Sequence, residues 1–278
     1  MALPLPTTLT PSKMSTFTDC ALAFRFSAID RVAEPPSLPT TRGTLVHAGL
    51  ERLFQLAAAD RTPEAGARCL DDAFAALADD PDLTGLGLGP DGLDELRHDA
   101  AVLVGKYFAL EDPRTIEPIG LELNLEIELD GLRLRGIIDR LELDPDGELV
   151  VTDYKTGHAP PVQYENSRLG GVHFYSMLCE QVFGRRPARV QLLHLADPVA
   201  IVATPSEQSS RGLSRKVAAI WQAVERSCAD EDFRPRPGKL CDWCGFRTWC
   251  PAHGGEPGAA PRRSGSTHAA TTSPAVRP

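Results

Sequence analysis

The sequence predicts an α/β protein in which helices surround a central sheet. Two observations support this prediction. Residues 119–156 alternate apolar and polar side chains with the period of two that is typical of strands. The segments before and after repeat apolar residues at helical spacing instead. The chain of 278 residues is long enough for one such domain with a sizeable core.

Helices are expected on both sides of the sheet region. The first has Ser12 or Ser15 as its candidate cap. Two of the helices flank a glycine-rich segment, and together they indicate a helical insertion at about residues 60–115. The expected helices cover residues 8–32, 43–59, 63–80, 91–110, 166–184 and 206–229. A further strand pair is expected at residues 188–205, before the last helix.

Charge and composition narrow the classes of function. The formal net charge is −9, so the whole protein has no basic field that would attract nucleic acid, although a local basic cleft is compatible with it. No run of eighteen apolar residues predicts a membrane helix, and the N-terminus lacks the pattern of a signal peptide. We therefore expect a cytoplasmic protein with no membrane partner. Its seven cysteines are then expected to be ligands or buried apolar residues rather than disulfides.

A first hairpin brings one acidic residue opposite another. Asp130-Gly131 is a strong signal for a two-residue turn. Counting back from that turn pairs apolar residues with apolar ones and acidic residues with arginines, which supports the register. The same count places Glu122 opposite Asp139.

A second hairpin adds a further acid and a lysine. Residues 144–147 read Asp-Pro-Asp-Gly, and a three-residue loop with Gly147 in the left-handed conformation would pair Asp139 with Asp153. Lys155 lies two residues later and shares the face of Asp153. A four-residue loop is the competing register.

The converging side chains favour a metal site. Carboxylates that lie together repel one another unless a cation joins them or one is protonated. Hard oxygen ligands suit Mg²⁺ or Mn²⁺, and a nearby lysine can stabilise a developing anion. Glu122, Asp139, Asp153 and Lys155 therefore suit metal-assisted hydrolysis of a phosphodiester. The alternative is a structural ion pair between Asp153 and Lys155 beside unrelated surface acids.

Several motifs resemble those of a known family. "GIIDRLEL" and "VVTDYKTG" resemble the two core motifs of the RecB-like nucleases of the PD-(D/E)XK superfamily. "RGTLVHAGLERLF" looks like the upstream helix of that family with its metal-binding histidine, and "LTPSKMSTFTDCALAFRF" resembles its N-terminal helix. The resemblance spans about residues 9–253 and implies a restriction-endonuclease-like core, in which a mixed central sheet is flanked by helices.

The resemblance implies roles for individual residues. His47, Asp139 and Asp153 match the metal ligands, and Lys155 matches the catalytic lysine. Glu122 is a candidate ligand through the hairpin register rather than through a family motif. Taken alone, His47 could instead be a helix histidine paired with Glu51 one turn later.

One position departs from the family pattern. Members carry Gln-x-x-x-Tyr in the helix after the lysine strand. Tyr175 fits the tyrosine and is a candidate for positioning the substrate, but Gly171 stands in place of the glutamine. This change puts the details of substrate positioning in doubt.

Three cysteines close to the C-terminus suggest a second metal site. Cys241, Cys244 and Cys250 have the spacing C-x₂-C-x₅-C, one ligand short of a tetrahedral site. His253 would complete a zinc knuckle. The other candidates for the fourth ligand are Cys20, Cys228, Cys179 and Cys69.

The resemblance favours an iron–sulfur cluster at these cysteines. The iron–sulfur branch of the family, which includes AddB and the CRISPR-adaptation nucleases, holds a [4Fe–4S] cluster with one N-terminal and three C-terminal cysteines. Cys20 and the C-terminal three match that pattern, and four thiolates suit such a cluster. The cluster would join the N-terminal helix to the C-terminal segment. Trp243 and Trp249 are expected to pack on the cluster rather than stack on bases.

We therefore expect one nuclease domain over residues 1–254, a cysteine segment at 236–253 and a disordered tail at 255–278. The resemblance implies an Mg²⁺- or Mn²⁺-dependent deoxyribonuclease that acts as an exonuclease on single strands or ends. DNA repair or recombination beside a helicase is the expected setting. The alternatives are a non-catalytic DNA-binding or scaffold subunit, a CRISPR-adaptation nuclease, and a small zinc-binding interaction protein.

Overall fold

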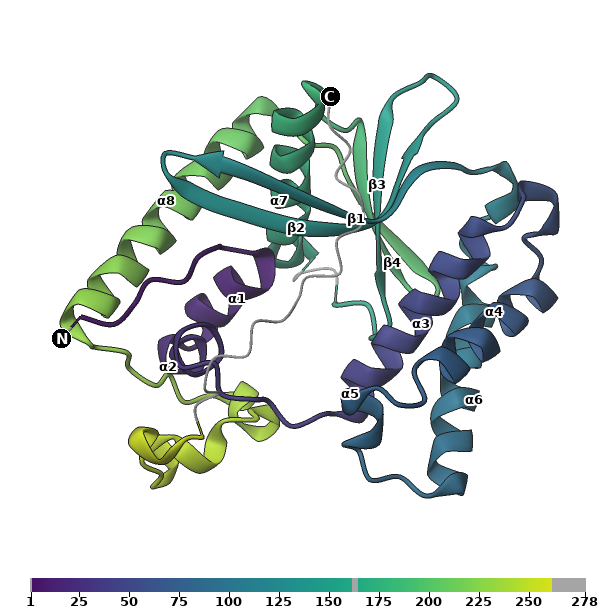
Figure 1. The fold of residues 1–278 in the computed structure, drawn as a ribbon. Coiled ribbons are helices and arrows are strands. Elements are labelled where there is room, and N and C mark those ends of the chain that lie inside the picture. The colour runs from purple at the N-terminus through teal and green to yellow at the C-terminus, as the bar shows by residue number, and fades with distance from the viewer. Residues whose placement is uncertain (1, 162–164, 262–278) are drawn as a thin grey trace. The chain divides into compact units, whose positions relative to one another are not determined.

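The structure is a computed structural model, which describes residues 2–161 and 165–261 (Figure 1). The chain divides into two compact units. Unit 1 consists of Met1–Pro35, Glu126–Gly136 and Arg211–Pro278, and unit 2 consists of Pro36–Leu125 and Ile137–Ser210. The predicted single nuclease domain over residues 1–254 stays a prediction.

A five-stranded sheet has the strand order β1-β2-β3-β4-β5. The strands are β1 (Glu117–Leu129), β2 (Leu132–Leu143), β3 (Leu149–Lys155), β4 (Arg189–His194) and β5 (Val199–Ala203). Strand β3 pairs antiparallel with β2 and parallel with β4, and β4 pairs antiparallel with β5. The sheet is therefore mixed, as the resemblance to the RecB-like nucleases implies.

The two predicted turns form as expected. Asp130 and Gly131 both have positive φ, as a two-residue hairpin turn of type I′ requires. In the second hairpin, the Asp144 N–H donates to the Glu148 carbonyl at 2.9 Å, and Gly147 has a φ of 76°. The loop is thus the predicted three-residue loop. Strands β2 and β3 then pair in the register that brings Asp139 opposite Asp153.

Unit 2 packs helices on the sheet. Its helices are α3 (Leu38–Gln55), α4 (Pro63–Ala76), α5 (Pro81–Thr84), α6 (Pro90–Tyr107) and α7 (Glu165–Phe183). Apolar side chains of α3, α4 and α6 form one core with Tyr154 and Leu193, so these helices cover one face of the sheet. Helix α3 starts before the predicted residue 43 because the Ser37 hydroxyl caps it.

Unit 1 has its own apolar core. Its N-terminal helices are α1 (Pro11–Asp19), α2 (Ala21–Phe24) and a π-helical turn (Arg25–Ile29), and most of α8 (Glu207–Asp230) also belongs to it. Phe24, Val224 and Phe246 are buried together in that core. The predicted capping of α1 by Ser12 or Ser15 is wrong, since the Thr10 hydroxyl accepts the capping hydrogen bond from the Lys13 N–H.

Two further sequence-based expectations concern a membrane and the tail. Among the residues that the structure describes, no helix combines the length and apolar character needed to cross a membrane. The start of the predicted tail forms a short 3₁₀ turn (Pro257–Ala259) followed by the buried Ala260. Residues 262–278 lie outside the described part of the chain.

Candidate metal centre

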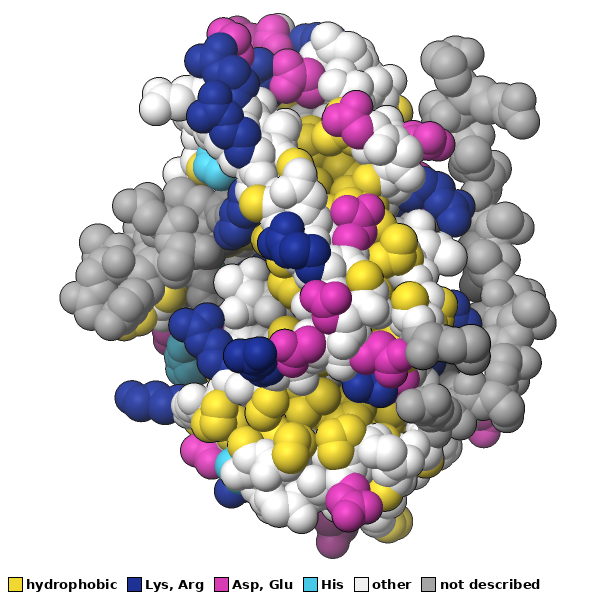
Figure 2. Space-filling view, turned by 90° about the vertical axis from the view of Figure 1, so that its left-hand side faces the viewer, with side chains coloured by type: hydrophobic (Ala, Val, Ile, Leu, Met, Phe, Trp, Pro, Cys, Tyr) yellow, Lys and Arg dark blue, Asp and Glu magenta, His cyan; other side chains and the backbone are white. Residues whose placement is uncertain are grey.

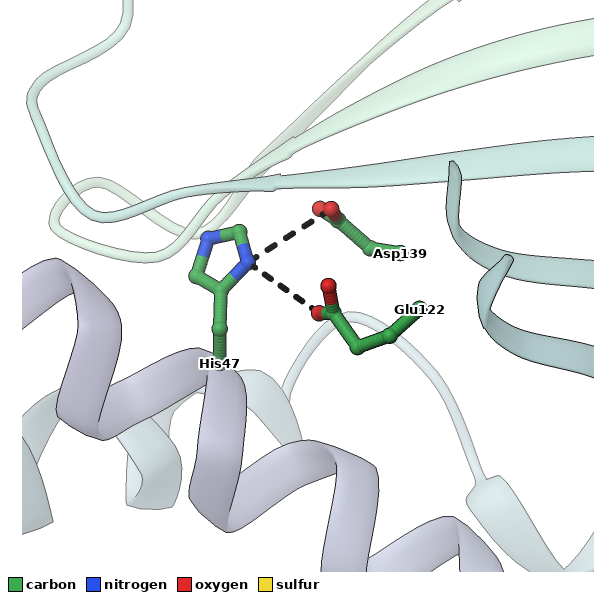
Figure 3. Close-up of side chains that lie close together, drawn as sticks. All are labelled: His47, Glu122 and Asp139. Carbon is green, nitrogen blue, oxygen red and sulfur yellow. Dashed lines mark ion pairs between the residues drawn. The ribbon is translucent and has the colours of Figure 1, made fainter. Parts of the chain in front are cut away.

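Three side chains of unit 2 converge on one point (Figure 3). His47 comes from α3, Glu122 from β1 and Asp139 from β2, and their ligand atoms all lie within 4.8 Å of one another. His47 Nδ1 is 3.5 Å from Asp139 Oδ1 and 3.8 Å from Glu122 Oε1. Two ligands on opposite sides of an Mg²⁺ ion would be about 4.2 Å apart, because each Mg–ligand bond is about 2.1 Å. The separations of 3.5 and 3.8 Å lie below this limit, so the three side chains could hold one hard divalent cation.

The ring of His47 is oriented as a metal ligand would be. Its Nε2 lies 3.1 Å from the backbone carbonyl of Tyr154, and because a carbonyl only accepts, Nε2 carries a proton and donates it. This leaves Nδ1 facing the two carboxylates, the arrangement that metal-binding histidines usually have. Within the described residues, the ion-pair partners of His47 are Asp139 and Glu122, so the alternative pairing with Glu51 is not seen.

The two carboxylates also change the protonation of His47. Burial alone would lower the pKa of this imidazole, but hydrogen bonds and charges from Asp139 and Glu122 outweigh burial and raise the pKa to about 10. In the absence of a metal, a proton on His47 therefore balances the two carboxylates. A divalent cation that binds the same atoms would displace that proton.

Each carboxylate is placed by the backbone around it. Asp139 is nearly buried, and its Oδ2 accepts a 2.6 Å hydrogen bond from the Tyr154 N–H on the neighbouring strand. Glu122 has a φ of 43°, which is unusual for a residue other than glycine and interrupts the regular alternation of β1. Backbone strain of this kind is common at functional sites. The sequence pattern predicts that Glu122 meets Asp139 but gives no sign of this conformation.

Asp153 and Lys155 form the neighbouring part of the site. Lys155 Nζ makes an ion pair with the Asp153 carboxylate, and the Tyr175 hydroxyl on α7 donates to Asp153 Oδ1 at 3.3 Å. Burial raises the pKa of Asp153, the charge of Lys155 opposes this shift, and the charge of Asp139 adds to it. As the side chains lie here, Asp153 is not a member of the three-residue group, and its role as a ligand stays a prediction.

The four predicted cluster cysteines lie near one another within unit 1. Cys20 sits between α1 and α2, and the other three belong to the short 3₁₀ turns near residues 239–253. Burial raises the pKa of Cys244, and the charges of Cys20, Cys241 and Cys250 raise it further. None of the four is in a disulfide. Four free thiols in one neighbourhood fit the donor set of an iron–sulfur cluster.

The remaining cysteines and tryptophans separate into buried and exposed residues. Cys69, Cys179 and Cys228 are buried, as expected for packed apolar residues. Trp249 packs against the core of unit 1. The expectation that Trp243 packs is wrong, since 82% of its surface is exposed.

Comparison with known proteins identifies similar sequences. Residues 8–251 match the sequence profile of the PD-(D/E)XK nuclease superfamily. The Gene 69 protein of Mycobacterium phage D29 is 24% identical over 262 residues, which cover 86% of this chain and 95% of the phage protein. The Gene 69 protein of Mycobacterium phage L5 is 29% identical over 134 residues, which cover 47% of this chain and 44% of that protein.

A solved structure has the same fold. A candidate exonuclease from Eubacterium rectale superposes with a TM-score of 0.56 at 14% sequence identity. The superposition covers 86% of this chain and 87% of that protein. At this level of identity the similarity concerns the fold.

Proposed function

From the premise that the chain belongs to the PD-(D/E)XK nuclease superfamily, we propose that it is a deoxyribonuclease that requires Mg²⁺ or Mn²⁺. The observation that carries this proposal is the convergence of His47, Glu122 and Asp139 beside the ion pair of Asp153 and Lys155. An imidazole and hard oxygen ligands suit these cations, and the lysine adds a positive charge next to them.

The proposed roles follow from where each side chain lies. His47, Asp139 and Glu122 would hold the cation, with Asp153 as a further ligand. The bound ion would supply Lewis-acid activation of the phosphodiester and of water. Lys155 is half-exposed, so its ammonium group can reach a phosphate oxygen on which negative charge develops. Tyr175 would keep the Asp153 carboxylate in place through its hydrogen bond.

We further propose that the substrate is single-stranded DNA or a DNA end, cut exonucleolytically. The segment 233–249 supports a single-stranded substrate because it carries four basic residues against one acidic residue and exposes the indole of Trp243.

The net negative charge is concentrated in one part of the chain. Residues 60–115 hold thirteen acidic and five basic residues, which account for eight of the nine net negative charges. The chain is therefore not uniformly acidic. On the face drawn in Figure 2, hydrophobic side chains reach the surface between charged side chains of both signs.

The cysteine group is proposed to hold a [4Fe–4S] cluster through Cys20, Cys241, Cys244 and Cys250. The thiol neighbourhood and the absence of disulfides at these residues support this proposal. Zinc is the alternative metal, with His253 as the candidate partner of the three C-terminal cysteines.

We propose a role in DNA repair or recombination beside a helicase, with CRISPR adaptation as the alternative setting.

The test is a cleavage assay with single-stranded DNA labelled at one end. We expect cleavage with Mg²⁺ or Mn²⁺, none with EDTA, and a loss of about 10³-fold or more in Asp139→Asn. A circular single strand distinguishes the mode of cutting, because an exonuclease leaves it intact. Equal cleavage by wild type and Asp139→Asn would contradict the proposal.

One observation favours a second candidate, a DNA-binding subunit without turnover. Gly171 lacks the side chain that the family places at this position, and a Cβ atom there would meet nothing within 4 Å. This reading predicts metal-independent DNA binding and no cleavage in the same assay.

A further inference from the structure

We propose that Arg140 is a positioning residue for the candidate metal centre, and that it acts from the opposite face of the sheet through Tyr154. The inference deepens the proposed function and rests on it, because it concerns the same ligands. Arg140 follows Asp139 in β2, so the two side chains point to opposite faces. Arg140 therefore cannot be a ligand itself.

The guanidinium group of Arg140 is fully buried, yet each of its nitrogens has a partner. The side chain has a relative exposure of 0%. A buried guanidinium needs acceptors for its five N–H groups, because unpaired donors in the interior are costly. Its acceptors are side chains of unit 2, namely Glu142, Tyr154, Tyr107, Glu111 and Thr152.

One of these acceptors connects the buried network to two ligands. The Tyr154 hydroxyl accepts from Arg140 at 2.9 Å. The backbone of the same residue donates to Asp139 Oδ2 at 2.6 Å and accepts from His47 Nε2 at 3.1 Å. A shift of Tyr154 along β3 would therefore move the hydrogen-bond partners of both ligands at once. Arg140 limits such a shift from the far face.

A second contact fixes the helix that carries His47. The guanidinium carbon of Arg140 lies 4.6 Å from the ring centroid of Phe54, a residue of α3. Phe54 follows His47 by seven residues, which is close to two helical turns, so both project from the same side of α3. Arg140 thus contacts α3 and β3 and is the chain neighbour of Asp139.

The geometry calls for arginine rather than lysine. The planar fork of arginine directs its donors outward in fixed directions, and the flat group also stacks on an aromatic ring. An ammonium group offers three donors from a single point. A lysine at position 140 would keep the positive charge between Glu111 and Glu142 but could not bond Tyr154 and stack on Phe54 together.

The chain offers a matched pair of variants for the test. One terminal nitrogen of Arg140 donates to both the Tyr154 hydroxyl, at 2.9 Å, and the Tyr107 hydroxyl, at 3.3 Å. Tyr154→Phe and Tyr107→Phe each remove one of these hydroxyls, but Tyr107 lies on α6, which supplies no proposed ligand. We expect Tyr154→Phe to weaken Mn²⁺ binding by about three- to ten-fold and Tyr107→Phe to leave it within about two-fold.

The measurement is calorimetric titration of each DNA-free protein with MnCl₂, together with thermal unfolding. Arg140→Lys should weaken Mn²⁺ binding by about ten-fold or more. If the Arg140→Lys protein does not fold, the comparison of Tyr154→Phe with Tyr107→Phe tests the proposal instead. Equal Mn²⁺ affinity in the two tyrosine variants overturns the proposal. A wild type that binds Mn²⁺ but does not cut DNA contradicts the proposed function alone, and a wild type that does not bind Mn²⁺ contradicts both.

Discussion

The candidate metal centre and the cysteine group are both built from segments far apart in the sequence, but they are held in different ways. The proposed metal ligands stand on α3, β1 and β2, and backbone groups of Tyr154 hydrogen-bond to His47 and Asp139. The cysteines stand on a helix junction and on short 3₁₀ turns. Strand pairing and a buried network can fix the first site before any metal binds, whereas we expect the second to depend on its cofactor for its shape.

The largest expected effect concerns the proposed iron–sulfur site. Cys244→Ala should abolish the bound iron and lower the melting temperature, because a cluster that joins distant segments stabilises them together. Mn²⁺ affinity should stay within about two-fold, since the metal centre has its own supports. Iron analysis, thermal unfolding and Mn²⁺ titration of anaerobically purified protein check this. Cys179→Ala is the control, because it removes a buried thiol outside the four-cysteine group, and this variant should keep its iron. Wild-type protein that contains zinc in place of iron would contradict the proposed cluster.

The next effect concerns the ligand set of the metal centre. Glu122→Gln should weaken Mn²⁺ binding by about ten-fold, because it removes one of two carboxylate charges that face His47. Glu126→Gln is the control on the same strand, since Glu126 pairs with Arg133 at 3.7 Å instead. Calorimetric titration measures both. The same affinity in both variants would exclude Glu122 from the ligands.

A smaller effect is expected for DNA binding by unit 1. Trp243→Ala should weaken binding of a short single strand by about five-fold, because one stacked base is lost, and Trp243→Tyr should retain most of the affinity. Fluorescence anisotropy with EDTA present measures binding without cleavage. An unchanged affinity in Trp243→Ala would remove this residue from the DNA contacts.

The smallest effect is on stability. Gly171→Gln should stabilise the fold by about 0.5–1 kcal/mol, because glycine is unfavourable inside a helix and a Cβ has room there. Gly212→Gln in α8, where a Cβ also has room, should give a similar gain. Urea denaturation compares them. A faster cleavage rate in Gly171→Gln but not in Gly212→Gln would show that position 171 contributes to substrate positioning. If Gly171→Gln is less stable than wild type, a side chain at position 171 does not have the room that we expect.

The sequence predicts the strand register at the candidate metal site because turn chemistry fixes the register of neighbouring strands. The turn at Asp130-Gly131 and the left-handed Gly147 brought Glu122, Asp139 and Asp153 to adjacent strands. Tyr154 lies between Asp153 and Lys155, so strand alternation places it on the opposite face, and it is buried there in the core with α3 and α6. These are local rules, so a single sequence is enough to apply them.

Other features depend on tertiary contacts that no local pattern encodes. The φ of Glu122 interrupts an alternation that reads as regular, and the exposure of Trp243 depends on what packs beside it. The network of Arg140 requires Glu111 and Tyr107, which come from the segment whose sequence predicts a helical insertion. The sequence signal that could have revealed this network is an arginine within an apolar strand, since a buried charge must have partners.

We propose that the candidate metal centre and Lys155 together cut DNA. The most direct measurement compares wild type with Lys155→Ala for both Mn²⁺ affinity and the rate of DNA cleavage. The account predicts Mn²⁺ affinity within a few-fold of wild type and cleavage that is slower by about 10²–10³-fold, because Lys155 supplies charge to the reaction and does not hold the ion. Undiminished cleavage by Lys155→Ala at saturating Mn²⁺ would contradict it.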